Sequence, residues 1–439
     1  MKNIYSILFR IVFPILFFYS CQNTGNLEEF CEAKPKNVLT KTLTLDDAIN
    51  EVTNVLNAIT PTRSMNGLKV SQCYTITRNM DNKPKLTSLE NENNQNEDAF
   101  IYIINFEDEA GYAIVAADPA APSTILALTD SGSLNPNQPQ DNPGLIMYLA
   151  NMENILNVIP PIHASYGPWC YQSMGGVMCT NEWGQRNPYN LYSPLVDGKL
   201  PPAGCTATAL AQLLTIYNYP LTYNGYTFNW DEMEKHMQVH LGNPREDYPP
   251  AYEMIGRLFQ QISLPYNLDM QFGLSIGSGA YLYNVPRTMA NLGFSDPGVY
   301  RDYYDTEEVK QALLDFYPVL VTGYAYMSSS KAAGQDEYLG INVDKSSINY
   351  SSGHTWLVDQ LIRMHRKVTI INPDGTDGMS FTQERELVHC NFGWNGTSNG
   401  LYYSGAFDTV NGCVEPLNNT DGTAGNYQYY MQTYYGAIE

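Results

Sequence analysis

The stretch PPAGCTATALAQLLTIYNYP, residues 201–220, places one cysteine between a Pro-Pro-Ala-Gly turn and an Ala- and Leu-rich run that ends at proline. Apolar residues recur there at helical spacing, so a helix is predicted over 205–217 with Cys205 in its first turn. Unpaired amides and the positive end of the helix dipole stabilise a thiolate, the nucleophilic form of cysteine. Cys205 is therefore a candidate nucleophile. The alternative is a buried or disulfide-bonded cysteine.

Composition and the N-terminus limit the class of protein. The chain has 439 residues, 44% of them hydrophobic, which is enough for a large core and two domains. Its formal net charge of -21 argues against binding nucleic acid or an anionic membrane surface. Residues 1–21 contain an apolar run that leads to Cys21 and resemble a bacterial lipoprotein signal. The resemblance implies a secreted protein or a lipoprotein at the outer membrane or cell surface, held only by a lipid on Cys21. A plain secretory signal is the alternative.

Export would place the other cysteines where disulfides form. Of the eight cysteines, Cys21 belongs to the signal and seven remain, an odd number, so one free thiol is expected. Cys170 and Cys179 flank a glycine-containing loop, and a short disulfide between them is one option. His389 and Cys390 are neighbours in an apolar strand, whose alternation puts them on opposite faces, and both are interpreted as structural.

The periodic segments predict two α+β domains that meet near residue 158. The first is expected to contain a helix opened by a capping box, a β-hairpin and an apolar helix, over residues 44–59, 99–118 and 145–156. The second begins with helices and continues with strands in an antiparallel sheet. Its predicted helices cover 205–217, 252–263 and 307–316, and its predicted strands cover 318–325, 354–364, 367–373 and 386–394.

Three further residues supply what a thiolate nucleophile needs, namely a proton partner, a group that orients the partner, and a donor for the oxyanion. His354, in SSGHTWLVD, is 149 residues after Cys205 and can be the proton partner. Asn391, in HCNFGWNG, can orient the imidazole. Gln185, in NEWGQRNPYN, can bind a developing oxyanion together with the backbone amide of Cys205. We expect folding to bring the Cys205 sulfur within hydrogen-bonding distance of the His354 imidazole.

The order Gln, Cys, His, Asn is similar to the papain-type arrangement. The motifs WGQRNPYN, AGCTATALAQLLTIYNYP, YPVLVTGYA, GHTWLVD and HCNFGWNGTSNG together resemble the streptopain-like cysteine peptidase family, whose members include secreted zymogens. The segment FIYIINFEDEAGYAIVAAD is similar to that family's propeptide. The resemblance implies a papain-like cysteine peptidase fold over 159–439, with a helical part and an antiparallel sheet, preceded by an inhibitory α+β propeptide over 22–158.

By the same resemblance, the chain is a cysteine endopeptidase that acts on proteins or peptides and is inhibited by its own propeptide. It implies Cys205, His354, Gln185 and Asn391 as site residues, and no cofactor or metal. Phe392 and Asn395 depart from the family pattern near the site, so an inactive peptidase-like surface lipoprotein that binds ligands stays open as an alternative. An acyltransferase or amidase with the same Cys-His pair is the other.

Overall fold

The structure is a computed structural model that describes residues 42–59, 69–78, 84–88, 98–157, 163–238, 246–274, 277–325, 337–344, 353–410 and 429–438. The predicted signal and Cys21 lie outside these residues. The chain divides into Met1–Val38 and Leu39–Glu439, and every described residue belongs to the second unit. Within the described ranges, no helix is both long and apolar enough to cross a membrane.

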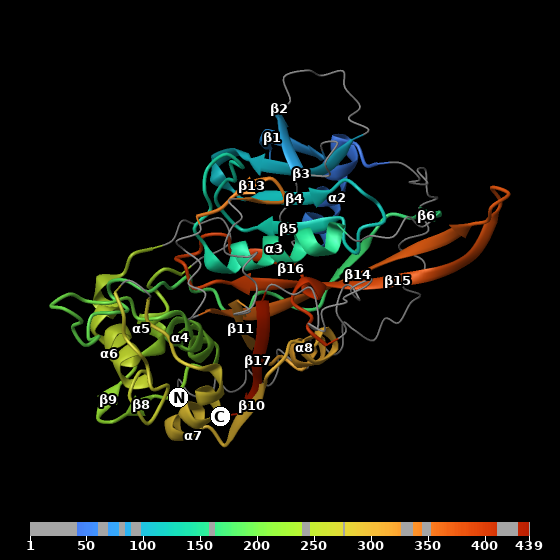
Figure 1. Cartoon of the computed structure of the whole chain (residues 1–439). Coiled ribbons are helices and arrows are strands. Elements are labelled where there is room, and N and C mark those ends of the chain that lie inside the picture. The colour runs from blue at the N-terminus through green and yellow to red at the C-terminus, as the bar shows by residue number, and fades with distance from the viewer. Residues whose placement is uncertain are drawn as a thin grey trace, which may run out of the picture. The chain divides into compact units, whose positions relative to one another are not determined.

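The N-terminal part, residues 42–157, combines an antiparallel sheet with two helices (Figure 1). The predicted capping box is confirmed, because Thr44 N donates to Asp47 Oδ2 at 3.0 Å and Asp47 N donates to Thr44 Oγ1 at 3.2 Å. The predicted hairpin and apolar helix are confirmed as well. The elements are α2 (Leu45–Ile59), β1 (Val70–Arg78), β2 (Pro84–Ser88), β3 (Ala99–Phe106), β4 (Tyr112–Ala116), β5 (Ile125–Thr129) and α3 (Pro143–Asn157).

The C-terminal part, residues 163–438, places its first helices beside a long antiparallel sheet, as predicted for an α+β domain. Helix α4 begins and ends at the predicted residues. The helices are α4 (Cys205–Tyr217), α5 (Trp230–Met233), α6 (Tyr252–Ile262), α7 (Val285–Leu292) and α8 (Thr306–Leu314). The strands are β6 (Ala164–Tyr166), β7 (Cys170–Ser173), β8 (Thr222–Tyr223), β9 (Tyr226–Thr227), β10 (Asp296–Arg301), β11 (Val319–Ala325), β12 (Glu337–Tyr338), β13 (Ile341–Asn342), β14 (His354–Ile371), β15 (Asp377–Asn391), β16 (Gly400–Tyr403) and β17 (Tyr429–Ile438).

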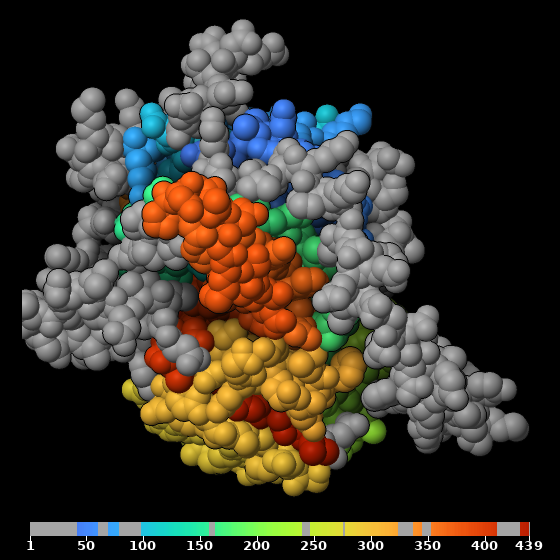
Figure 2. Space-filling view, turned by 90° about the vertical axis from the view of Figure 1, so that its right-hand side faces the viewer, coloured from blue at the N-terminus to red at the C-terminus, as the bar shows by residue number. Residues whose placement is uncertain are grey.

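One predicted break in the sheet is wrong. Residues 354–364 and 367–373 were expected as separate strands, but β14 runs unbroken through His354–Ile371. The polar residues between the two segments do not interrupt the strand, because β15 pairs with β14 from Leu357↔Asn391 to Ile371↔Asp377. The outer end of this hairpin forms the orange ridge in Figure 2, and Met379 near its tip is 72% exposed.

The two parts share one sheet, which was not predicted. Among the described residues the strand order is β10-β17-β11-β14-β15-β16-β5-β4-β3-β1-β2, with β6 and β7 also paired to β14. Strand β16 pairs with β15 on one side and with β5 on the other, where Leu401 stands opposite Leu128. Buried side chains of both parts, such as Ile114 and Trp356, belong to one hydrophobic core. The N-terminal part is thus held by a backbone ladder as well as by side-chain packing.

The junction requires a glycine at position 400. A Cβ on Gly400 would overlap the Leu128 carbonyl of β5. We predict that Gly400→Ala weakens the pairing of β5 with β16 by about 1–3 kcal/mol, as other overpacking substitutions do. Hydrogen exchange of the β5 amides in the full chain should then accelerate about tenfold. Gly176→Ala is the matched control, since a Cβ there meets nothing within 4 Å. Equal exchange in both variants would contradict the role of this junction.

Candidate active site

Cys205 is the first residue of α4, as the sequence predicts, and is 8% exposed. The preceding Gly204 has a φ of 97°, and a Cβ on it would lie 2.9 Å from the carbonyl oxygen of Ser278. Only glycine therefore lets the two segments approach so closely. Thr206 Oγ1 donates to the carbonyl of Ala280 at 2.9 Å, which fixes the Ser278–Ala280 segment beside the first turn of α4.

The Cys205 thiol is neutral in this structure. Burial raises its pKa, and hydrogen bonds from the backbone and hydroxyl groups of Thr355 and Thr206 offset only part of that effect. The expected stabilisation of a thiolate at the helix start is therefore outweighed by desolvation here. Thr355 directly follows His354 in β14, so the thiol contacts the neighbour of the predicted proton partner.

His354 begins β14 and is 2% exposed. Its Nε2 donates to the carbonyl oxygen of Phe392 at 2.9 Å, because a carbonyl can only accept. Burial lowers the pKa of His354 to about 4, and the bond to Phe392 opposes this only in part. The imidazole also stacks with Trp356 and meets Trp394 edge to face, at centroid distances of 6.2 and 6.0 Å. It is a neutral ring enclosed by aromatic side chains.

The expected contact between Cys205 and His354 is not made in this structure. Both residues are described, and no hydrogen bond joins them; the Nε2 proton is engaged by the Phe392 carbonyl. Asn391 does not bond to the imidazole either, since its Nδ2 donates to Asn181 O at 2.9 Å. The backbone carbonyl of Gln185 accepts from Ala203 N at 2.8 Å. The segment that contains Gln185, the predicted oxyanion donor, therefore lies beside the turn that leads to Cys205.

Helix α3 of the N-terminal part packs against the surroundings of His354. A Cβ on Gly144 would overlap the ring of Phe392, whose carbonyl binds the imidazole. In the sheet, Gly323 stands opposite His354, and Met147 Sδ lies 2.8 Å from where a Cβ on Gly323 would stand. Two residues of α3 thus touch the structure that positions His354.

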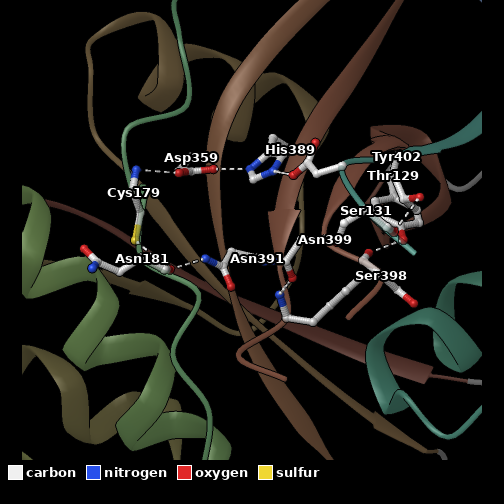
Figure 3. Close-up of polar contacts among 12 residues, drawn as sticks. Thr129, Ser131, Cys179, Asn181, Asp359, His389, Asn391, Ser398, Asn399 and Tyr402 are labelled. Atoms are coloured by element: carbon white, nitrogen blue, oxygen red, sulfur yellow. Dashed lines mark hydrogen bonds and ion pairs between the residues drawn. The ribbon is translucent and has the colours of Figure 1, made fainter. Parts of the chain in front are cut away.

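A cluster of polar and ionisable groups around His389 lies next to the site, and the local sequence pattern does not reveal it (Figure 3). Asp359 Oδ2 accepts from Cys179 N at 2.7 Å, and Asp359 Oδ1 lies 2.6 Å from His389 Nδ1. Two residues after Cys179, the Asn181 carbonyl accepts from Asn391. The sequence does show Asp359 and His389 as ionisable residues within apolar strands. It does not show that β14 and β15 pair so that the two side chains meet.

The cysteine predictions are partly wrong. The free thiols among the described residues are Cys73, Cys179, Cys205 and Cys390, so more than one thiol is free. Cys170 is disulfide-bonded, and Cys179 is not its partner. Cys179 is instead fully enclosed, and burial raises the pKa of its thiol to about 12.

Comparison with known proteins identifies the family. The model of the Spi protease inhibitor matches residues 40–156, and the model of the peptidase C10 family matches residues 183–403, just over half of the chain. The chain belongs to the peptidase C10 family. By family it is a cysteine-type endopeptidase, and the matched inhibitor segment coincides closely with the N-terminal part, which we call the inhibitor domain from here on.

Individual relatives are distant. The thiol protease/hemagglutinin PrtT of Porphyromonas gingivalis is 22% identical over 347 residues, which cover 70% of this chain but only 34% of that protein. Streptopain of Streptococcus pyogenes is 23% identical over 361 residues, covering 76% of this chain and 80% of streptopain. A prointerpain A fragment of Prevotella intermedia is 19% identical, with a TM-score of 0.45, and covers 76% of this chain and 94% of the fragment.

The neutral state of Cys205 predicts how the intact chain reacts with iodoacetamide. Below its raised pKa, the thiolate fraction grows tenfold per pH unit, so alkylation of Cys205 should accelerate by about tenfold per unit between pH 6 and 8. Peptide mass spectrometry of the full chain measures this, with Cys73 as the internal control, since burial raises the pKa of its thiol to about 11. An alkylation rate of Cys205 that does not change over this pH range would reveal a preformed thiolate and contradict the neutral state of the thiol.

Proposed function

We propose that this chain is the latent precursor of an endopeptidase in which Cys205 is the nucleophile and His354 its proton partner. Gln185 and the Cys205 amide would bind the oxyanion, and Asn391 would orient the imidazole. The observation that carries the proposal is the position of Cys205 at the first turn of α4, with its thiol against Thr355, one residue from His354. A shift of the imidazole away from the Phe392 carbonyl would free the ring to turn an unprotonated nitrogen toward the sulfur.

In the proposed reaction, His354 takes the thiol proton and the Cys205 sulfur attacks the scissile carbonyl carbon. Gln185 and the Cys205 amide donate to the oxyanion of the tetrahedral intermediate. The carbon–nitrogen bond then breaks, and the imidazolium gives its proton to the leaving amine. Water, deprotonated by His354, hydrolyses the remaining thioester and returns the thiol.

Latency follows from the same geometry. A buried neutral imidazole that donates to Phe392 cannot accept the thiol proton at that nitrogen. We propose that the inhibitor domain holds this arrangement through α3, where Gly144 and Met147 pack against the residues around His354. Cleavage near residue 158 and loss of the inhibitor domain would release the imidazole.

We also propose that the chain is exported. The support is the signal-like run that ends at Cys21, together with the family membership. Acylation of Cys21 would hold the chain at a membrane surface, whereas a plain secretory signal would release it. Its substrates would be proteins or peptides, as the relatives named as proteases suggest. Mass spectrometry of the N-terminal peptide separates an acylated cysteine from an unmodified terminus.

Removal of the nucleophile tests the chemistry. We predict that Cys205→Ala, expressed as the full chain and then treated to remove the inhibitor domain, loses casein cleavage by about a thousandfold or more under reducing conditions. Cys73→Ala, which removes a free thiol of the inhibitor domain, should process and cleave like the parent. Activity of Cys205→Ala equal to that of the parent would reject the proposal.

The oxyanion role of Gln185 makes a separate prediction. Gln185→Ala should lower kcat by about 100- to 1000-fold with little change in KM, because the lost donor acts on charge that exists only in the transition state. Arg186→Ala, at the exposed neighbouring position, is the control and should retain kcat. Steady-state kinetics on a peptide substrate measures both parameters, and a defect confined to KM would assign Gln185 to substrate binding instead.

A further inference from the structure

At the sheet junction, a charged side chain of the inhibitor domain reaches into the peptidase part. Asp130 directly follows β5, and its Oδ2 lies 2.8 Å from His389 Nε2. The other imidazole nitrogen is 2.6 Å from Asp359 Oδ1. The backbone of Asp130 is fixed as well, since its amide donates to the Asn399 carbonyl at 2.9 Å. Figure 3 shows the Asp359–His389 pair pointing toward the Thr129–Ser131 segment.

The geometry around His389 fits a positively charged imidazole. Ionised carboxylates only accept hydrogen bonds, and only an imidazolium can donate from both nitrogens at once. The side chains of His389 and Asp359 are 4% and 0% exposed, whereas that of Asp130 is 47% exposed. Burial lowers the pKa of His389, but Asp359 and Asp130 together outweigh it and leave the pKa well above 6.5.

The remaining titratable groups near the cluster carry no charge near neutral pH. Cys179 adjoins Asp359, Cys390 follows His389 on β15, and Tyr402 lies on β16. Burial raises the pKa of each of these groups, to about 12 for Cys179 and well above the ordinary value for the other two. The opposing residues in the strands beside His389 are uncharged, Gln360 in β14 and Leu401 in β16. The two carboxylates are therefore the charges that His389 faces within the described residues.

We propose that the β16 edge, with His389 and Asp359, is a docking site that recognises a β-strand followed by a carboxylate and holds it best while His389 is protonated. In this chain the occupant is β5 with Asp130. This inference rests on the proposed function, in which residues 42–157 inhibit the peptidase part and must leave before it is active. Backbone pairing supplies the affinity for a strand, and the imidazolium selects the strand that ends in a negative charge.

Docking of the inhibitor domain at this site is coupled to the protonation of His389. Asp359 stays with the peptidase part, so only the share of the raised His389 pKa that comes from Asp130 disappears when the inhibitor domain leaves. A raised pKa in the docked state means that the stabilisation is complete below the pKa that His389 has once the inhibitor domain has left. It is lost as pH rises through the raised value. The inhibitor domain is therefore held more weakly in alkaline solution.

Two other groups near the contacts of the inhibitor domain titrate at about pH 7 or below. Burial lowers the pKa of His354 to about 4, and burial raises that of Glu51, which accepts from Tyr171 OH, to about 7. The linkage at His389 is thus best isolated above pH 7.

The docking site also connects to the candidate active site. Asn399, whose carbonyl binds the Asp130 amide, uses its Oδ1 to accept from Phe392 N at 2.9 Å. The carbonyl of the same Phe392 binds His354 Nε2. Release of Asp130 therefore loosens a segment that is two hydrogen bonds from the imidazole.

The test compares Asp130→Asn with its parent, both as full chains carrying Cys205→Ala to prevent self-cleavage. Hydrogen exchange of the β5 and β16 amides, corrected for the intrinsic rate at each pH, gives the opening equilibrium from pH 7 to 10. In the parent, opening should increase with pH. In Asp130→Asn it should be about tenfold greater at pH 7 and nearly independent of pH, since one opposite charge shifts a pKa by about one unit or more.

Asp108→Asn removes an exposed carboxylate of the same domain and should follow the parent. His389→Gln, which keeps a hydrogen-bonding side chain without the charge, should also open independently of pH; if it does not fold, the Asp130→Asn result still decides. The inference is overturned if Asp130→Asn matches the parent in both extent and pH slope of opening. Hydrogen exchange does not depend on peptide cleavage. The docking inference can therefore fail while the proposed peptidase chemistry stands, and it can hold while that chemistry fails.

Discussion

Backbone pairing of β5 with β16, in which Leu128 stands opposite Leu401, joins the inhibitor domain to the peptidase part as one antiparallel sheet. An edge strand exposes unpaired amides and carbonyls, and β5 satisfies those of β16 on the side that β15 leaves open. This ladder fixes the position of Asp130, which follows β5, and of α3, which packs on Phe392. The contacts that the inhibitor domain makes near the candidate site depend on this register, because a slip by one residue would reverse every side chain of β5.

The chemical consequence is that the two candidate reacting groups are kept neutral. Burial raises the pKa of Cys205 and lowers that of His354 to about 4, so neither group carries the charge that a thiolate–imidazolium pair needs. The proton on His354 Nε2 is committed to the Phe392 carbonyl. Beside these neutral groups, His389 lies between two carboxylates, which raise its pKa well above the ordinary value. His354 and His389, on the neighbouring strands β14 and β15, thus have pKa values shifted in opposite directions, and the difference arises from their partners rather than from their burial.

Local sequence was enough to predict the main helices, the N-terminal hairpin and the family, and it failed where the structure depends on distant pairing. The helix that begins at Cys205 and the capping box at Thr44 are local patterns, and both are present. The β5–β16 junction joins residues about 270 positions apart and leaves no local trace. The role of His389 was missed for the same reason, because its partner Asp130 lies in the other domain. The Cys205–His354 contact stays a prediction for the form that lacks the inhibitor domain.

The most direct measurement is labelling with a thiol-directed peptidase inhibitor before and after removal of the inhibitor domain, followed by mass spectrometry of the modified peptide. We predict little label in the intact chain and stoichiometric label on Cys205 once residues before about 158 are gone, because the proposed activation requires the imidazole to leave Phe392. Equal labelling of Cys205 in the intact chain would contradict latency. Label on another cysteine of the processed chain would contradict the assignment of the nucleophile.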